Sequence, residues 1–335
     1  MSPRLRGRLL RLVLTLAGLG VLAVLIDRVG ITAIWAHIRR FGPGFLVTIP
    51  LGAVWMMAQA LAWNRVQAVF HPGLSTGWLW RVKVTAESLN TLLPTANLGG
   101  DALRAWLIRY RVPLSKALPG VLVDKTFEFA AGMLFMATGL ITAVFFYPLP
   151  RSLMAPALIC LGLACLGIML LVAFQVLGIW RVLIRLMGWF PAARRFLERR
   201  SDRIRQLDAN LLCFYRSGTA RMGTVLALHF LARLLGAVEM LVILRALGLS
   251  VGFAAALFVT AMVTVANTIF FVFPGQWGIY EGAGVLVLGL LGAGAGIGLG
   301  MGLIRRIRRL VFVLLGLVFF ALDRRPRLKA DPGVT

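Results

Sequence analysis

Acidic residues, histidine and cysteine are all scarce in this sequence of 335 residues. It contains 12 Asp and Glu, 3 His and 3 Cys, against 36 Lys and Arg, so the formal net charge is +24. Charged residues make up 14% of the chain and apolar residues 60%, whereas soluble domains have roughly 25% charged residues. This composition excludes a water-soluble globule and a disordered chain. It also argues against a nucleic-acid-binding protein, which the basic excess would suggest in a more polar chain.

The few histidines and cysteines form no set that suggests chemistry. The cysteines follow no metal-binding or disulfide spacing, and the histidines follow no ligand pattern. The sequence also contains no P-loop and no nucleophile-elbow motif. We therefore predict no catalytic residues of a known type, no metal site and no cofactor.

Long apolar runs dominate the sequence instead. A helix that crosses a bilayer needs about 20 mostly apolar residues. Such runs lie at 9–26, 44–63, 121–147, 155–177, 222–247, 252–273, 283–303 and 310–322. The sequence therefore predicts an all-α polytopic integral membrane protein with about seven or eight transmembrane helices. We expect one membrane domain over residues 1–323 and a basic cytoplasmic tail over 324–335.

The distribution of Lys and Arg indicates the orientation, because short basic loops stay in the cytoplasm. Arginines precede the first span and fill the segment 178–221, which places the N-terminus in the cytoplasm of a bacterial inner membrane. The same segment alternates apolar and basic residues, as an interfacial helix does, so it acts as an anchor or as a dock for anionic lipid. Arginines at 305–309 break strict alternation. One of the runs 252–273 and 310–322 is therefore expected not to cross fully.

Two segments, 83–109 and 260–284, carry polar residues on one helical stripe and then break at a proline. The stripes have the same spacing and consist of Lys83, Glu87, Asn90 and Thr91 in the first segment and of Thr260, Thr264, Asn267 and Thr268 in the second. This similarity predicts a weak internal repeat, with chance resemblance as the alternative.

The breaks in these two segments also match each other. Asp101 follows Pro94 by seven residues, and Glu281 follows Pro274 by seven. Backbone freed by proline at membrane depth must be buried in protein or line a wet cavity, and paired broken segments point to a transporter binding site. We expect re-entrant hairpins whose second helices offer free N–H groups to an anionic head group. Alternatively, they are ordinary interhelical loops in which the two acids cap the helices.

Further ionisable residues lie within the apolar runs, where charge is costly. Asp124 and Glu128 are one turn apart at the start of 121–147. They suit cation or proton coupling or an acid/base pair, or they form a charge cluster at a helix end. Arg233 and Glu239 lie too far apart to pair well within one helix, so Glu239 is expected to pair with a neighbouring helix.

Three motifs, LNTLLPTANLGGDALRAWLI, VLVDKTFE and FPGQWGIYEGAG, occur in this order along the chain. Together they resemble the membrane domain of the lysylphosphatidylglycerol synthase/flippase-like family, and they are similar to its stand-alone branch found with hopanoid-lipid genes. The resemblance spans nearly the whole chain and implies an inner-membrane domain that moves or handles a lipid. No aminoacyltransferase domain follows the membrane domain here, so lipid aminoacylation is not expected.

We therefore expect a lipid flippase or transporter whose partners are membrane lipids with anionic head groups. Enzymes of lipid biosynthesis are candidate partners, and nucleic acid is not. The residues expected to bind the substrate are Glu87, Asn90, Pro94, Asn97, Gly99, Gly100, Asp101, Arg104, Asn267, Pro274, Gly275, Gly278 and Glu281. The residues expected to couple an ion or proton are Asp124, Glu128, Arg233 and Glu239. The alternatives are a membrane-embedded lipid-modifying enzyme and a non-catalytic scaffold of a lipid-biosynthesis complex.

Overall fold

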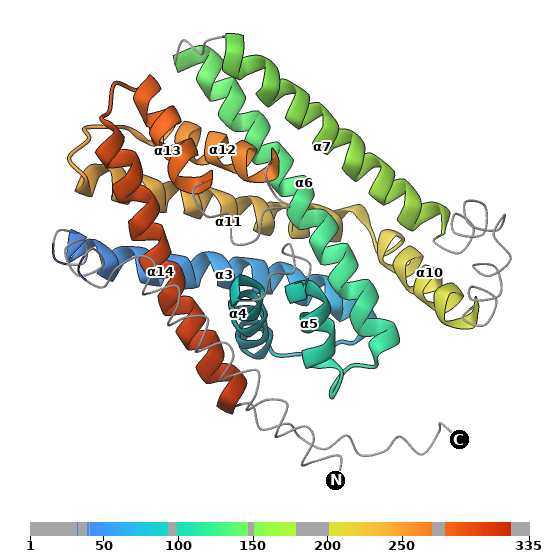
Figure 1. Cartoon of the computed structure of the whole chain (residues 1–335). Coiled ribbons are helices and arrows are strands. Elements are labelled where there is room, and N and C mark those ends of the chain that lie inside the picture. The colour runs from blue at the N-terminus through green and yellow to red at the C-terminus, as the bar shows by residue number, and fades with distance from the viewer. Residues whose placement is uncertain are drawn as a thin grey trace, which may run out of the picture.

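The computed structural model describes residues 41–92, 99–146, 151–178, 201–269 and 279–322, together with residues 32 and 39. Within these ranges the chain is all-helical, which confirms the predicted fold class (Figure 1). The described helices are α3 (Gly44–Phe70), α4 (Thr76–Leu92), α5 (Gly99–Ile108), α6 (Leu114–Phe146), α7 (Arg151–Leu177), α10 (Ser201–Tyr215), α11 (Thr219–Ala246), α12 (Phe253–Ile269), α13 (Ile279–Leu290) and α14 (Ala295–Leu322). The predicted span 9–26 lies outside the described residues.

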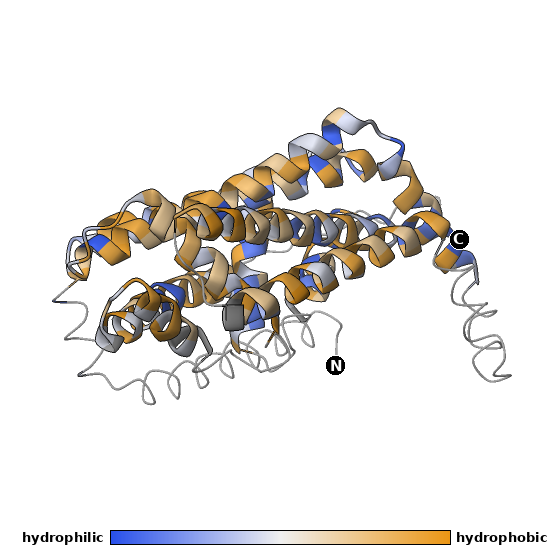
Figure 2. Ribbon diagram, turned by 90° about the horizontal axis from the view of Figure 1, so that it is seen from above, coloured by the Kyte–Doolittle hydropathy of each residue, from blue (hydrophilic) through white to orange (hydrophobic). Residues whose placement is uncertain are grey.

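Four of these helices, α3, α6, α7 and α11, are long and apolar enough to cross a membrane. They correspond to four of the runs predicted from the sequence, and α12 is a shorter apolar helix. Apolar residues cover most of the helices, and hydrophilic residues interrupt them at a few places (Figure 2). The protein is therefore a multi-pass membrane protein.

Helix α6 is longer than a bilayer requires. Its 33 residues extend over about 50 Å, whereas the hydrocarbon core is about 30 Å thick. The stretch from Phe129 to Phe146 has no charged residue and is about 27 Å long, which nearly spans that core. Asp124 and Glu128 precede this stretch on the same helix.

Each of the two broken segments forms a helical hairpin. In the first, the 17-residue α4 is followed by the 10-residue α5; in the second, the 17-residue α12 is followed by the 12-residue α13. The two helices of each hairpin contact each other, α14 packs against α4 and α13, and α6 packs against α5 and α12. The two hairpins thus pack in similar ways, which agrees with the proposed repeat. The residues at both breaks, 93–98 and 270–278, lie outside the described residues.

The sequence-based boundaries near the C-terminus were wrong. The runs 283–303 and 310–322 were predicted as separate segments joined by an arginine-rich loop, but the break falls earlier and α14 is one continuous helix of 28 residues. Gly292, with φ of 74°, takes the left-handed conformation that glycine adopts most easily in the turn before α14. The arginines at 305–309 therefore lie in the middle of α14, where two of them contact residues of α11, as described below.

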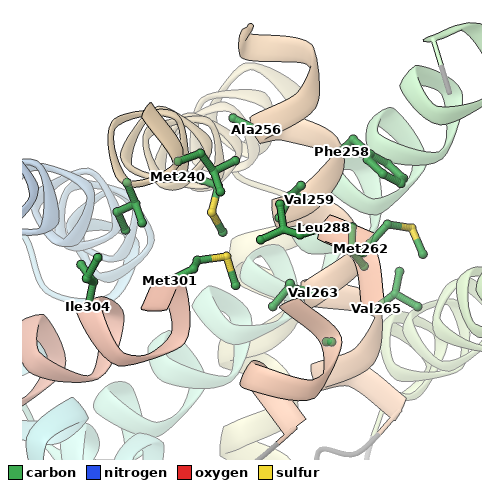
Figure 3. Close-up of a cluster of buried hydrophobic side chains, with 14 of the residues drawn as sticks. Met240, Ala256, Phe258, Val259, Met262, Val263, Val265, Leu288, Met301 and Ile304 are labelled. Carbon is green, nitrogen blue, oxygen red and sulfur yellow. The ribbon is translucent and has the colours of Figure 1, made fainter. Parts of the chain in front are cut away.

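A cluster of buried apolar side chains holds the four helices α11, α12, α13 and α14 together. Met240 on α11, Phe258 on α12, Leu288 on α13 and Met301 on α14 belong to it (Figure 3). Leu288 and Met301 are fully buried. The second hairpin is thus fixed by apolar packing against α14.

Close packing in this cluster depends on the glycine-rich stretch 292–302, as its composition predicts for a membrane helix pair. A Cβ added at Gly298 would lie 2.6 Å from the backbone nitrogen of Val285 on α13. We expect Gly298→Leu to separate α13 from α14 and to lower the free energy of unfolding by about 1–3 kcal/mol. Thermal unfolding in detergent measures the effect. Gly296→Leu is the matched control, because nothing lies within 4 Å of a Cβ at Gly296, and equal stability of the two variants would contradict the prediction.

A hydrogen-bond chain ties the amphipathic α10 to α6 through α7. The Tyr215 hydroxyl donates to Gln175 Oε1 at 2.7 Å, and Gln175 Nε2 donates to Thr126 Oγ1 at 2.8 Å. Burial raises the pKa of Tyr215 to about 12, so this hydroxyl remains a donor at physiological pH. Only residues 201–221 of the predicted interfacial segment 178–221, together with Gly178, lie within the described residues.

Candidate functional site

The α4–α5 hairpin brings together two residues that the sequence marked separately. The backbone N–H of Gly100, at the start of α5, donates to Asn90 Oδ1 at 3.2 Å. A Cβ at Gly100 would lie 2.8 Å from Asn90 Cβ, so only glycine allows this approach without a shift. Asn90 therefore occupies one of the N–H groups that were expected to be free for a head group.

Arg104 on α5 is the centre of a cluster of charged side chains. Its Nη1 lies 2.8 Å from Asp124 Oδ2, and its Nη2 lies 3.2 Å from Asp101 Oδ1. The guanidinium carbon also lies 4.8 Å from the centre of the Trp63 ring on α3, a cation–π distance. With 3% of its side chain exposed, Arg104 joins α3, α5 and α6 by charge and by packing.

Asp124 on α6 is completely buried, with 0% of its side chain exposed. One oxygen faces Arg104, and the other lies 2.9 Å from His229 Nε2 on α11. Both oxygens of this carboxylate therefore have protein partners. The sequence alone did not assign His229 to the site, because sequence spacing does not reveal a partner 105 positions away.

Two lysines complete the cluster. Lys125 Nζ lies 3.3 Å from Asp101 Oδ2 and 3.4 Å from Glu128 Oε1, and Lys83 Nζ lies 3.9 Å from Glu128 Oε2. Lys83 belongs to the polar stripe of the first broken segment and Lys125 to the motif VLVDKTFE, yet neither was assigned to the site. Lys83 has the longest ion pair of this group, so it is the cation that an incoming anion would draw away from its acid most easily.

These side chains line a pocket between α3, α4, α5 and α6. The cavity is small, with a volume of about 30 Å³, and the charged residues around it are Lys83, Glu87, Asp101, Arg104, Lys125 and Glu128. Three cations thus face three acids, and Asn90 and Gly100 lie beside them. Such a concentration of ionisable groups is costly inside a membrane bundle, which marks the pocket as a candidate functional site.

Other residues assigned from the sequence lie away from this pocket. Arg233 on α11 packs against α6, since a Cβ at Gly132 would lie 3.3 Å from Arg233 Nη2. Asn267 is a half-buried residue near the end of α12, and its Oδ1 is buried without a hydrogen-bond partner. The residues Pro94, Asn97, Pro274, Gly275 and Gly278 lie outside the described residues, as do the side-chain environments of Gly99 and Glu281.

Glu239 on α11 has the interhelical partner that its position predicts. Its Oε1 lies 2.8 Å from Arg308 Nε on α14, and 2% of its side chain is exposed. On the same pair of helices, Arg305 Nη2 donates to the carbonyl of Gly236 at 3.2 Å. These acceptors on α11 explain why the arginines at 305–309, which the sequence placed in a cytoplasmic loop, lie inside a helix.

The fold and the pocket together define a polytopic α-helical membrane protein with a charged pocket enclosed by four helices and two helical hairpins packed on a shared helix. Comparison with protein families identifies the family within this class. The family described as the lysylphosphatidylglycerol synthase TM region matches residues 8–316, and the chain belongs to this family. Neither the curated proteins nor the solved structures contain a significant match to the chain. Membership supports a function related to membrane lipids, and the resemblance of the three motifs to this family is thereby confirmed, while their similarity to the hopanoid-associated branch stays a prediction.

Proposed function

We propose that the protein translocates a lipid head group across a bacterial inner membrane, in which its N-terminus faces the cytoplasm. The observation that carries the proposal is the pocket of six ionisable side chains inside a largely apolar helix bundle. A lipid crosses a bilayer slowly because its polar head group must enter hydrocarbon, where unpaired charge is costly. A pocket that offers charged partners lowers that cost for the head group while the acyl tails remain in lipid.

The charge balance of the pocket suits exchange of partners. An anionic phosphate would take Lys83 from Glu128, which keeps Lys125 at 3.4 Å, while Arg104 stays fixed by Asp124 at 2.8 Å. Because each pair that breaks is replaced by a new one, the head group binds without leaving a buried charge unpaired. Phospholipids and hopanoid-type lipids both remain within the proposed substrate range, the latter through the resemblance of the motifs to the hopanoid-associated branch.

A lipid-modifying enzyme is supported less well by this geometry. Asp124, half of the proposed acid/base pair, has both oxygens engaged by Arg104 and His229 and is completely buried. Glu128 is then the carboxylate of the pair that lines the pocket. A scaffold role predicts that the pocket acids can be replaced without effect, so one experiment separates all three functions.

Substitution of the pocket acids tests the proposal. In proteoliposomes of phosphatidylethanolamine and phosphatidylglycerol, dithionite quenching of NBD-labelled phosphatidylglycerol reports translocation. We expect Glu128→Gln and Asp101→Asn each to lower the rate at least about tenfold, since each loses a charge-assisted contact in the path. Asp202→Asn on α10, an exposed position, is the control and should retain the wild-type rate.

Two outcomes of this experiment would contradict translocation. Unchanged rates in both pocket variants, with the protein correctly inserted, would reject the pocket as the path. A change in the mass of membrane lipids when the protein is expressed, abolished by Glu128→Gln, would show an enzyme instead.

A further inference from the structure

A second pocket lies between α3, α4 and α14, on the other side of Glu87 from the first. Its cavity volume is about 80 Å³, and Trp55, Glu87, Arg308, Arg309 and Phe312 are among the residues that line it. Glu87 borders both pockets. The balance of charge differs between the two, because two arginines and one acid face the second pocket.

The guanidinium of Arg308 is held in place from several sides. Glu239 on α11 lies 2.8 Å from its Nε, and the guanidinium carbon lies 5.7 Å from the Trp55 ring and 5.9 Å from the Phe312 ring. A Cβ at Gly52 on α3 would lie 2.8 Å from Nη1, so glycine provides the space in which the group sits. An arginine fixed in this way is pre-organised to bind.

One end of this guanidinium has no acceptor. Arg308 is 9% exposed, and its Nη1 is buried without a hydrogen-bond partner. A buried donor left without an acceptor is destabilising, and more so when it is charged. Such groups in native proteins call for a reason. Here the residue lines a pocket, and the exposed cation Arg309 stands next to it in the sequence and in the pocket wall.

We propose that this second pocket binds a phosphate group, with Arg308 and Arg309 as its donors. The phosphate belongs to a phosphodiester lipid or to free inorganic phosphate, because both present the same oxygens to the two guanidinium groups. Glu239 neutralises Arg308 from behind and Glu87 stands in the pocket wall, so the phosphate is held by the directed N–H donors of Arg308 and Arg309 rather than by a net positive charge. The proposal is independent of transport, because binding requires neither a second leaflet nor a gradient.

The chain carries a net charge of +24 and therefore attracts anionic lipid at many places. A test of the proposal must count the lipids that are tightly held, so that the loss of a single site can be seen. The full chain is purified in detergent with limiting phosphatidylglycerol, and native mass spectrometry counts the lipids retained per chain. We expect Arg309→Gln to retain one lipid fewer than the wild type, with affinity at that site reduced at least about tenfold. Arg306→Gln, on the same helix but outside the pocket lining, removes the same charge and should retain the wild-type number.

A second pair of variants addresses Arg308 itself. Arg308→Gln combined with Glu239→Gln removes the buried pair without leaving one charge behind, and Gly52→Ala displaces the guanidinium with no change of charge. Both should lose the same lipid as Arg309→Gln. Diacylglycerol, which has the same tails without phosphate, should not occupy the site.

The competition arm identifies the source of the phosphate. If millimolar inorganic phosphate displaces the lipid lost in Arg309→Gln, the site takes the phosphate group from either source. If inorganic phosphate binds there and phosphatidylglycerol does not, the site is one for free phosphate, which also supports the proposal. Wild-type lipid counts in Arg309→Gln and in Gly52→Ala, or equal retention of diacylglycerol, would overturn it.

Discussion

Asp124→Ala is expected to lower the free energy of unfolding by about 3 kcal/mol or more, because it leaves a buried cation short of its main partner. The carboxylate lies between Arg104 and His229 at 2.8 and 2.9 Å and is completely buried. After the substitution Arg104 keeps Asp101, at 3.2 Å, as its one carboxylate within ion-pair distance among the residues that the structure describes. Unfolding of the purified chain in detergent, followed by tryptophan fluorescence, measures the loss.

Two companion variants separate the buried charge from the loss of side-chain volume. Asp101→Ala removes the other acid from the same arginine, but 22% of that side chain is exposed, so a loss of about 1 kcal/mol or less is expected. Asp124→Leu combined with Arg104→Met replaces the pair with apolar groups and should restore most of the stability. If Asp124→Ala and Asp101→Ala were equally mild, Asp124 would not be the charge that holds α5, α6 and α11 together.

The double variant also distinguishes structure from function at this site. Stability restored by apolar groups does not restore charge to the pocket that Arg104 lines. We therefore expect Asp124→Leu with Arg104→Met to assemble in the membrane but to translocate labelled lipid poorly.

The fold class followed from the sequence because hydrocarbon imposes a simple requirement. A long apolar run must be helical and long enough to cross the bilayer, so composition and run length locate α3, α6, α7 and α11. Proline and glycine mark the two breaks for an equally local reason. These features depend on neighbours along the chain, and a single sequence contains them.

The α14 boundaries failed for the opposite reason. The arginines at 305–309 look like a loop under a rule that counts charge along the chain. Their actual environment depends on Glu239 and the Gly236 carbonyl of α11, more than sixty positions away. Pairing across helices cancels the cost that the rule assumes, so the correct boundary requires three-dimensional contacts.

The residues of the candidate site also fall into those that local sequence motifs identify and those that only three-dimensional contacts reveal. The motifs identified Asn90, Gly100, Asp101, Arg104 and Glu128, and the structure brings these residues to one pocket. Lys83, on the polar stripe, and Lys125, in the motif VLVDKTFE, were not assigned, because their ion pairs with Glu128 and Asp101 depend on contacts that the sequence alone does not give. Glu239 was grouped with Asp124 by its chemistry alone, yet it lies in a separate cluster with Arg308.

The second large loss of stability is expected when the ion pair of this separate cluster is broken. Glu239→Leu removes a carboxylate of which 2% is exposed and which lies 2.8 Å from Arg308 Nε. Arg308 then remains buried beside Trp55 and Phe312 without an acid, and Arg305 remains on the same helix. We expect a loss of about 3–5 kcal/mol in the free energy of unfolding, because one member of a buried ion pair is left alone.

The contact between α11 and α14 is where this loss should become visible. Without Glu239, the cheapest way to rehydrate Arg308 is for the middle of α14 to move away from α11, which also weakens its packing on α4. Disulfide trapping between cysteines placed at positions 236 and 305 should therefore become slower in Glu239→Leu. Adding Arg308→Met should restore both stability and trapping, since no cation then needs water. If Glu239→Leu alone were as stable as this double variant, the pair would contribute nothing to holding α14, and apolar packing alone would fix that helix.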